Sequence, residues 1–183
     1  MRSEMIFAGF GGQGIIMMGV LAAKAAGIYD GKNVAQSQSY GPAARGGACR
    51  TDVIISDDHI DYPRCNAPNV LVAMSNKAYD AYIGENKDPN AIIILDSSLV
   101  DRKTDAFSNV FCIPATDIAE KELGHKICTN VVMCSAIAAI TGLISKEGIR
   151  KAIGTSVRPQ FVELNEQAVD VGYSYGLEQL NGR

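Results

Sequence analysis

The sequence predicts an α/β fold of three layers, with a doubly wound, mostly parallel sheet and helices on both faces. Short apolar runs alternate with segments of helical periodicity, which is the pattern of strands joined by crossover helices. Two of these runs, residues 70–73 and 92–95, are apolar throughout, as expected for central strands that helices cover on both faces. The chain has 183 residues and no linker or internal repeat, so we expect a single domain over residues 1–183.

The first strand is expected at residues 5–8, where an apolar run leads directly into a cluster of glycines. A β-branched run follows at 49–56, and the pair Asp57-Asp58 after it is typical of a turn. We therefore expect residues 60–62 to return beside that run as a further strand. The remaining strands are expected at 33–38, 70–73, 92–95 and 110–113.

Helices are expected between and after these strands. The segment 13–27 is apolar on nearly every side, so it must be covered by the sheet and by something else, such as a partner subunit. Residues 127–145 carry no charge over nearly the length of a membrane span, but their polar and small residues favour a buried or subunit-facing helix. Further helices are expected at 76–83, ended by Gly84, from an N-cap at Asp117 to a stop at Gly124, and as an amphipathic helix over 161–175.

Composition and charge narrow the function classes. The chain has 17 Lys plus Arg against 20 Asp plus Glu, and the net charge of -3 argues against a strongly basic nucleic-acid binder. The five cysteines are scattered without a C-x-x-C pair, which indicates free thiols in a reducing compartment rather than a zinc or iron–sulfur site. The first residues lack the pattern of a secretory signal peptide. We therefore expect a cytoplasmic protein that neither spans a membrane nor binds nucleic acid.

A glycine cluster follows the first strand. Gly9, Gly11 and Gly14 satisfy G-x-G-x-x-G between a predicted strand and a predicted helix, the context that gives this pattern meaning. Such glycines let backbone N–H groups at a helix N-terminus approach an anion, usually a phosphate. A nicotinamide dinucleotide would also need an acidic residue at the end of the second strand, where residues 36–38 are Gln-Ser-Gln. A turn that only packs strand against helix, without a ligand, stays open as an alternative.

A second glycine-rich segment, residues 39–47, is expected at the carboxyl end of the second strand, the edge at which open α/β sheets bind ligands. Tyr40 offers an aromatic face and a hydroxyl, and Arg45 offers a planar cation suited to carboxylate or phosphate. The glycines Gly41 and Gly46 allow close approach. The alternative is a surface loop whose arginine is solvated or pairs with a nearby Asp.

Other polar residues are weaker candidates for a functional site. Ser75 and Asn76, and the run 96–98, follow predicted strands and would either face the same crevice or cap helices. His59 and His125 are expected at the surface, because no neighbouring residues make either of them a catalytic group. A nucleophile elbow, a P-loop and a metal-ligand array are all missing from the sequence.

The two glycine segments together resemble one family. Residues 7–15 (Phe-Ala-Gly-Phe-Gly-Gly-Gln-Gly-Ile), residues 36–42 (Gln-Ser-Gln-Ser-Tyr-Gly-Pro) and Arg45-Gly46-Gly47, followed by 49–56, are similar to the gamma subunit of 2-oxoacid:ferredoxin oxidoreductases. The likeness extends to about residue 175. The form of the second segment looks most like the 2-oxoglutarate branch. Ala43 stands where similar chains often carry an acidic residue, so pyruvate-type and indolepyruvate-type gamma subunits stay open as alternatives.

The resemblance implies an enzyme of several subunits that oxidatively decarboxylates a 2-oxoacid, forms an acyl-CoA and reduces ferredoxin, with this chain as a non-catalytic subunit. It implies that thiamine diphosphate, magnesium and iron–sulfur clusters belong to other subunits, and that this chain contacts coenzyme A. The implied partners are alpha and beta subunits, with a ferredoxin-like delta subunit as a further candidate, and ferredoxin through the complex. Isolated, the chain would be a monomer or a homodimer. An exposed apolar helix, at 13–27 or 130–144, would then be a subunit interface.

The cofactor-binding residues expected on this basis are Gly11, Gly12, Gln13, Gly14, Ser39, Tyr40, Gly41, Arg45 and Gly46. The first four would position backbone donors, and Arg45 with Tyr40 would meet a phosphate, a carboxylate or a partner's backbone. We expect no catalytic residue and no metal ligand in this chain. Two other interpretations compete: a self-sufficient NAD(P)-dependent dehydrogenase, and a structural assembly module whose glycines only permit tight packing.

Overall fold

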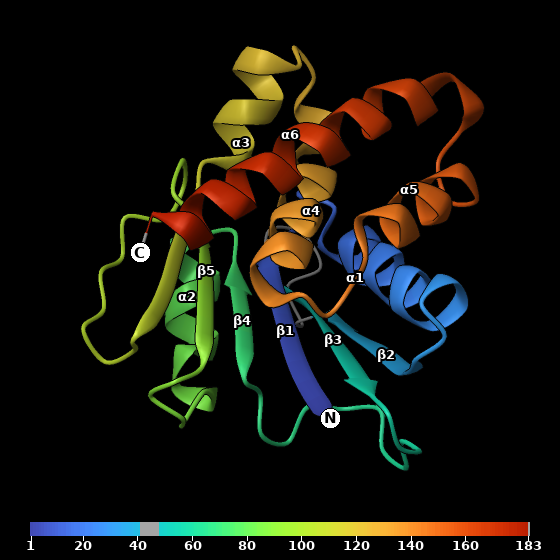
Figure 1. The fold of residues 1–183 in the computed structure, drawn as a ribbon. Helices are drawn as coiled ribbons and strands as arrows, with labels where there is room; N and C mark the ends of the chain where they lie inside the picture. The colour runs from blue at the N-terminus through green and yellow to red at the C-terminus, as the bar shows by residue number, and fades with distance from the viewer. Residues whose placement is uncertain (41–47, 183) are drawn as a thin grey trace.

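The computed structural model describes residues 1–40 and 48–182, and their middle layer is one six-stranded sheet (Figure 1). The strand order is β2-β3-β1-β4-β5-β6. The strands are β1 (Arg2–Phe10), β2 (Asn33–Tyr40), β3 (Ala48–Ser56), β4 (Val70–Ala73), β5 (Ile92–Asp96) and β6 (Asn109–Ile113). Because β1, β4, β5 and β6 run parallel, the predicted mostly parallel sheet is confirmed.

Strand β3 is the exception to this direction, since it lies antiparallel between β1 and β2. Both edges of β3 are therefore paired, and no edge is left for the strand expected at residues 60–62. That prediction is wrong. Residues 57–69 instead form an irregular connection, which Glu4 holds against the start of β1. Its carboxylate accepts hydrogen bonds from the backbone N–H groups of Asn66 and Ala67, at 2.6 and 2.9 Å.

Helices cover both faces of the sheet and complete the three predicted layers (Figure 1). One face carries α1 (Ile15–Lys24), α4 (Thr129–Thr141), α5 (Lys146–Gly154) and α6 (Val162–Asn181), and the other carries α2 (Asn76–Tyr82). The shorter helical segments are η1 (Ala25–Tyr29), η2 (Ile83–Glu85), α3 (Ala115–Asp117), η3 (Ile118–Glu122), η4 (Lys126–Cys128) and η5 (Pro159–Phe161).

Most of the uncharged stretch at 127–145 lies in α4, and twelve of the thirteen residues in this helix are buried. Helix α6 covers the side of α4 that faces away from the sheet (Figure 1). The expectation that this stretch could serve as a subunit interface is therefore wrong for α4. Helix α1 is only partly covered, and Met17 on it keeps 38% of its surface exposed. In the part of the chain that the structure describes, no helix is both long and apolar enough to cross a bilayer.

The helix after β6 begins at Ala115, so Asp117 lies inside its first turn. The prediction that Asp117 is the N-cap is therefore wrong. Asp96, at the end of β5 and fully buried, provides the cap from a distant part of the chain. The Thr116 hydroxyl donates to the Asp96 carboxylate at 2.6 Å, and the Thr116 backbone N–H lies 3.4 Å from it. Gly124 has φ +69° after the following helical turns, which confirms the predicted stop.

Two glycines let α6 lie directly on the backbone of α4. A Cβ atom on Gly172 would collide with the carbonyl oxygen of Val132, and one on Gly176 would lie 2.7 Å from the carbonyl oxygen of Ala136. No larger residue at either position allows this separation of the helices.

We predict that Gly172→Ala lowers the free energy of unfolding by about 1–3 kcal/mol, because the added methyl group overpacks the helix contact. Denaturant unfolding monitored by circular dichroism measures this change. The matched control is Gly154→Ala in α5, where a Cβ atom meets nothing within 4 Å. That variant should be neutral or slightly more stable, since Ala favours helix over Gly. Equal losses in both variants would contradict the role of the α4–α6 contact.

Glu4 makes the connection between β3 and β4 sensitive to pH. Burial by itself would raise the pKa of Glu4, but hydrogen bonds from Ala67, Arg2 and Asn66 outweigh it and hold the pKa below its ordinary value of 4.5. A carboxyl group with a lowered folded-state pKa stabilises the fold above its unfolded pKa. This stabilisation is lost as the pH falls through the folded-state pKa.

We predict that Glu4→Gln lowers the free energy of unfolding by about 1–3 kcal/mol near neutral pH, because two backbone N–H groups lose a charged acceptor. The difference from the wild type should shrink once the pH is well below 4.5, where the wild-type carboxylate is itself protonated. Urea denaturation at both pH values provides the comparison. A difference that does not change with pH would show that the charge of Glu4 contributes nothing.

Candidate functional site

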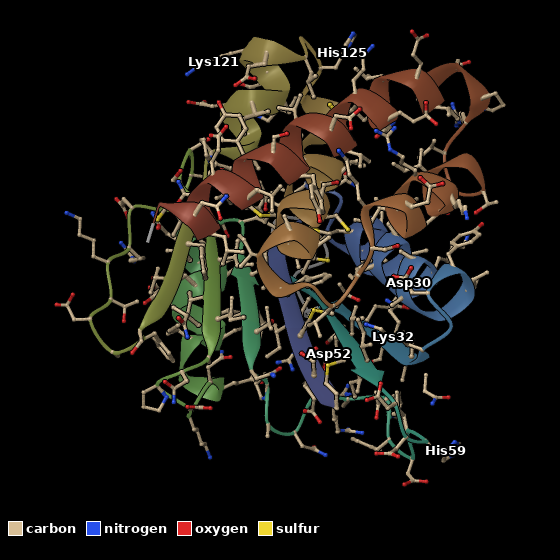
Figure 2. All side chains as sticks on the ribbon, viewed as in Figure 1. Asp30, Lys32, Asp52, His59, Lys121 and His125 are labelled. Carbon is tan, nitrogen blue, oxygen red and sulfur yellow. The ribbon has the colours of Figure 1, made fainter. Side chains whose placement is uncertain are left out.

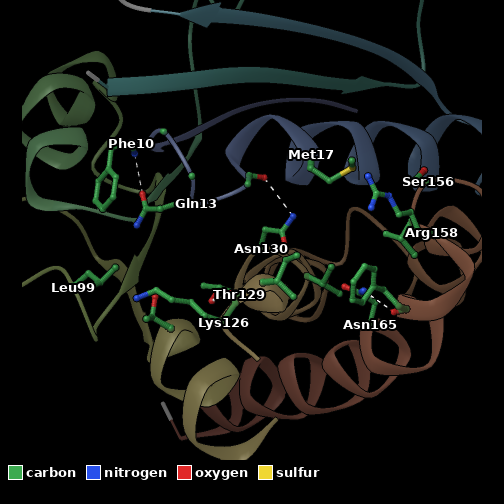
Figure 3. A pocket seen from close by; sticks show the side chains of 18 residues that line it. Phe10, Gln13, Met17, Leu99, Lys126, Thr129, Asn130, Ser156, Arg158 and Asn165 are labelled. Atoms are coloured by element: carbon green, nitrogen blue, oxygen red, sulfur yellow. Dashed lines mark hydrogen bonds between the residues drawn. The ribbon is translucent and has the colours of Figure 1, made fainter. Parts of the chain in front are cut away.

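The first glycine segment forms a tight turn between β1 and α1. Gly12 and Gly14 adopt φ angles of +97° and +72°, a region that favours glycine, and Gly14 is the residue directly before α1. The Gln13 side chain fixes the turn with both ends of its amide. Its Oε1 accepts from the Phe10 backbone N–H at 2.9 Å, and its Nε2 donates to the Met74 carbonyl oxygen at 2.7 Å (Figure 3).

This turn lies where the strand order reverses direction. From β1 the chain continues to β2 and β3 on one side of it, and then crosses to β4 on the other side. In open α/β sheets, the crevice at the carboxyl ends of such strands is the usual place for a ligand. The bond from Gln13 to Met74 spans this crevice, because Met74 directly follows β4.

A cavity of about 980 Å³ opens beside the glycine turn. Four segments that are distant in sequence build its walls: the turn with the start of α1, residues around the β5 and β6 ends, the start of α4, and the connection from α5 to α6 (Figure 3). Its size falls within the range of small-molecule and cofactor sites. Phe10 and Ile127 at the cavity are 41% and 68% exposed, so apolar side chains are open to solvent there.

The glycine turn offers unused hydrogen-bond donors to this cavity. The backbone N–H groups of Gly11 and Gly12 donate to no other residue in the part of the chain that the structure describes. The same holds for the first turn of α1, as is usual at a helix N-terminus. Such N–H groups and the positive end of the helix dipole attract anions. The cavity therefore suits a molecule with an anionic group joined to an apolar part.

Three polar side chains from distant segments line the same cavity. Asn130, only 7% exposed, donates from Nδ2 to the Gly14 carbonyl oxygen at 3.4 Å, so the start of α4 is tied to the glycine turn. Lys126 forms an ion pair of 2.7 Å with Glu120. Arg158 has no carboxylate partner within residues 1–40 and 48–182. Among the described residues that line the cavity, none is acidic.

The structure brings four of the predicted site residues together, Gly11, Gly12, Gln13 and Gly14. Ser39 lies elsewhere. Residues 39 and 40 belong to the end of β2 rather than to the loop, and Ser39 lines a hollow of about 420 Å³ on the face of the sheet that carries α2. Gly41, Arg45 and Gly46, and the side chain of Tyr40, lie outside the described residues. Tyr40 pairs with Cys49, and Cys49 with Gly9, so both glycine segments leave the sheet at one edge.

The hollow beside Ser39 is built around a paired arginine. Arg50 donates to Asp52 at 2.5 and 3.1 Å and to Glu85 at 2.6 Å, and it lies over the ring of Tyr82. Burial alone would lower the pKa of Arg50, but these two carboxylates raise it above its ordinary value. These contacts join β3 to η2 through Glu85 and to the end of α2 through Tyr82.

Sequence reasoning missed Lys126, Asn130 and Arg158 as candidate site residues. Each is far in sequence from the glycine turn and reaches the cavity only through tertiary packing. The beginning of the uncharged stretch indicated where α4 starts. The neighbouring sequence did not indicate that this end of the helix lies beside the glycine turn. Of the two alternatives for Ser75 and Asn76, Ser75 caps α2, since its side chain accepts from the Ala78 N–H. Asn76 is the first residue of α2 and caps no helix, because its side chain accepts from the Asp101 N–H in the connection after β5.

Neither histidine lies at the cavity. Figure 2 shows His59 and His125 at opposite ends of the molecule, and both are exposed, as predicted. Asp30 also lies away from the turn, because its carboxylate accepts hydrogen bonds from Ser145 at 2.7 and 2.5 Å. Within the described residues, no three His, Cys, Asp or Glu side chains lie together as a metal site. Burial raises the pKa of the Cys134 thiol to about 12, so this thiol stays protonated.

Comparison with known proteins places this fold and turn in a family. The family described as pyruvate ferredoxin/flavodoxin oxidoreductase matches residues 4–175. The 2-oxoglutarate synthase subunit KorC of Methanocaldococcus jannaschii is 42% identical over 180 residues, which cover 97% of this chain and 96% of that protein. The pyruvate synthase subunit PorC of the same organism is 31% identical over 181 residues, which cover 96% and 98%.

A solved structure agrees with these relatives. The crystal structure of the keto/oxoacid ferredoxin oxidoreductase gamma subunit from Geobacter sulfurreducens is 38% identical, with a TM-score of 0.89 and coverage of 98% of each chain. The resemblance seen in the two glycine segments is thereby confirmed over nearly the whole length. The chain belongs to the pyruvate ferredoxin/flavodoxin oxidoreductase family.

Proposed function

We propose that this chain is the gamma subunit of a 2-oxoglutarate:ferredoxin oxidoreductase and that it holds coenzyme A in the cavity beside the glycine turn. The assembled enzyme would decarboxylate the oxoacid, transfer the acyl group to coenzyme A and pass two electrons to ferredoxin. This chain would be a binding subunit without catalytic residues of its own. The observation that carries the proposal is the set of unused N–H donors at Gly11 and Gly12, which line a cavity that is also lined by Lys126 and Arg158 and, among the described residues, by no carboxylate.

Coenzyme A matches this cavity in chemistry. Its diphosphate can accept hydrogen bonds from the backbone N–H groups of the turn and is stabilised by the N-terminus of α1. Its pantetheine arm and adenine ring can pack on the apolar walls, which include Phe10, Met17 and Val157. The exposed apolar side chains at the cavity suggest that partner subunits cover the bound coenzyme.

The relatives favour 2-oxoglutarate over pyruvate as the oxoacid. Identity is 42% to the 2-oxoglutarate synthase subunit and 31% to the pyruvate synthase subunit of one organism. The chain itself contributes no pocket that we assign to the oxoacid. We propose that the oxoacid, thiamine diphosphate, magnesium and iron–sulfur clusters are bound by partner alpha, beta and ferredoxin-like delta subunits.

Two further parts of the proposal concern the second glycine segment and the compartment. We propose that Tyr40, Gly41, Arg45 and Gly46 meet the coenzyme or a partner subunit at the same edge of the sheet, and that Ser39, on the face that carries α2, meets a partner subunit. The free cysteines among the described residues fit the reducing cytoplasm, where we place the enzyme.

Gly11→Val tests the coenzyme site. A Cβ atom on Gly11 meets nothing within 4 Å and its φ is not positive, so the variant should fold with unchanged thermal stability. The valine side chain would occupy space in the lining of the cavity next to the N–H donors and hinder the approach of an anion, which would remove at least one charge-assisted hydrogen bond, worth about 1.5–3 kcal/mol. We therefore predict that the Kd and the KM for coenzyme A rise by about tenfold or more in the assembled enzyme.

Gly84→Val is the matched control, because a Cβ atom there also meets nothing within 4 Å and the residue lies far from the cavity. It should leave the KM for coenzyme A unchanged. An unchanged KM and Kd in Gly11→Val, with the complex intact, would refute the coenzyme site at this turn. Loss of assembly without a change in the kinetics of the intact complex would favour the purely structural role.

A further inference from the structure

Arg158 differs from most other arginines of the described chain. Arg2, Arg50, Arg102 and Arg150 each donate to a carboxylate. Arg158 has no such partner among the described residues, although it is exposed and lines the large cavity. Figure 3 shows it across the cavity from Gln13. A guanidinium group at a cavity without lining carboxylates is free to bind an anion.

The backbone around Arg158 is conformationally restricted. Pro159 restricts the residue before it to extended conformations, and Arg158 has φ -64° and ψ 143°, as this restriction requires. The Arg158 carbonyl oxygen accepts from the Phe161 N–H at 2.9 Å, which closes the turn that leads into α6. This turn fixes where the Arg158 side chain leaves the backbone, at a residue that lines the cavity.

A second cation, Lys24, contacts the same connection between α5 and α6. Lys24 of α1 donates from Nζ to the Ser156 hydroxyl at 2.8 Å, and Ser156 lines the cavity two residues before Arg158. Lys24 likewise forms no ion pair with a carboxylate in the part of the chain that is described. The other cation of the cavity, Lys126, is already neutralised by Glu120. Positive charge therefore concentrates at the α5–α6 connection.

Coenzyme A carries anionic groups at two places, a diphosphate and a phosphomonoester at the 3′ position of its ribose. The glycine turn offers single N–H donors, which suit the diphosphate. The monoester carries close to two charges and three free oxygens, which suit the fork of a guanidinium. We propose that Arg158 binds the 3′-phosphate and makes the site selective for coenzyme A over 3′-dephospho-coenzyme A. This inference rests on the proposed coenzyme site.

The test compares equilibrium binding of coenzyme A and 3′-dephospho-coenzyme A to the assembled enzyme by isothermal titration calorimetry. The wild type should bind coenzyme A about tenfold or more tightly than the dephospho form, as expected for a charge-assisted pair. In Arg158→Gln, the affinity for coenzyme A should fall to that for the dephospho form, whose own affinity should not change. Arg158→Lys should fall between, since it keeps the charge and loses the fork.

Lys151→Gln is the matched control, because it removes an exposed positive charge from nearby α5, outside the cavity. It should not alter the affinity ratio. Equal affinity of the wild type for both compounds, or an equal loss for both in Arg158→Gln, would overturn the inference. Failure of the proposed coenzyme site looks different, since Gly11→Val would then leave the affinities for both compounds unchanged. If the wild type binds neither compound, both proposals fail.

Discussion

The amide of Gln13 is the interaction on which the site depends. Its Oε1 accepts a hydrogen bond from the Phe10 N–H, and its Nε2 donates one to the Met74 carbonyl oxygen. One side chain therefore connects the end of β1 to the end of β4. Without this tie, the turn from Gly11 to Gly14 would be held mainly by the Gln13 backbone N–H and by Asn130. Because the Gln13 Oε1 and one of the two Nε2 N–H groups are bonded inside the protein, Gln13 positions the donors of Gly11 and Gly12.

The rest of the molecule supports this turn from one face of the sheet. Helix α4 reaches the turn with Asn130, and α6 holds α4 in place through the close contact at Gly172 and Gly176. The connection from α5 to α6 then brings Arg158 to the same cavity. The core thus has two roles here. The packing that buries α4 also sets the distance between the glycine turn and Arg158.

Much of the fold followed from local pattern, because buried parallel strands and their crossover helices have clear apolar signals. The wrong predictions concern features that tertiary contacts decide. Residues 60–62 had strand-like composition but no free strand edge, since β3 was already paired on both sides. Asp117 had the spacing of a cap, but Asp96 from another strand took that role. In the site, Gly11 and Gly14 were predictable because their context is local, whereas Arg158 lines the same cavity only as a result of tertiary packing. Ser39 fell on the other face, because successive strand residues alternate between faces.

The most direct measurement is the crystal structure of the assembled enzyme with coenzyme A bound. Our account predicts diphosphate oxygens at about 3 Å from the backbone nitrogens of Gly11 or Gly12, in the cavity between α1 and α4. Coenzyme A bound wholly outside this cavity, with the turn making no contact to it, would contradict the account.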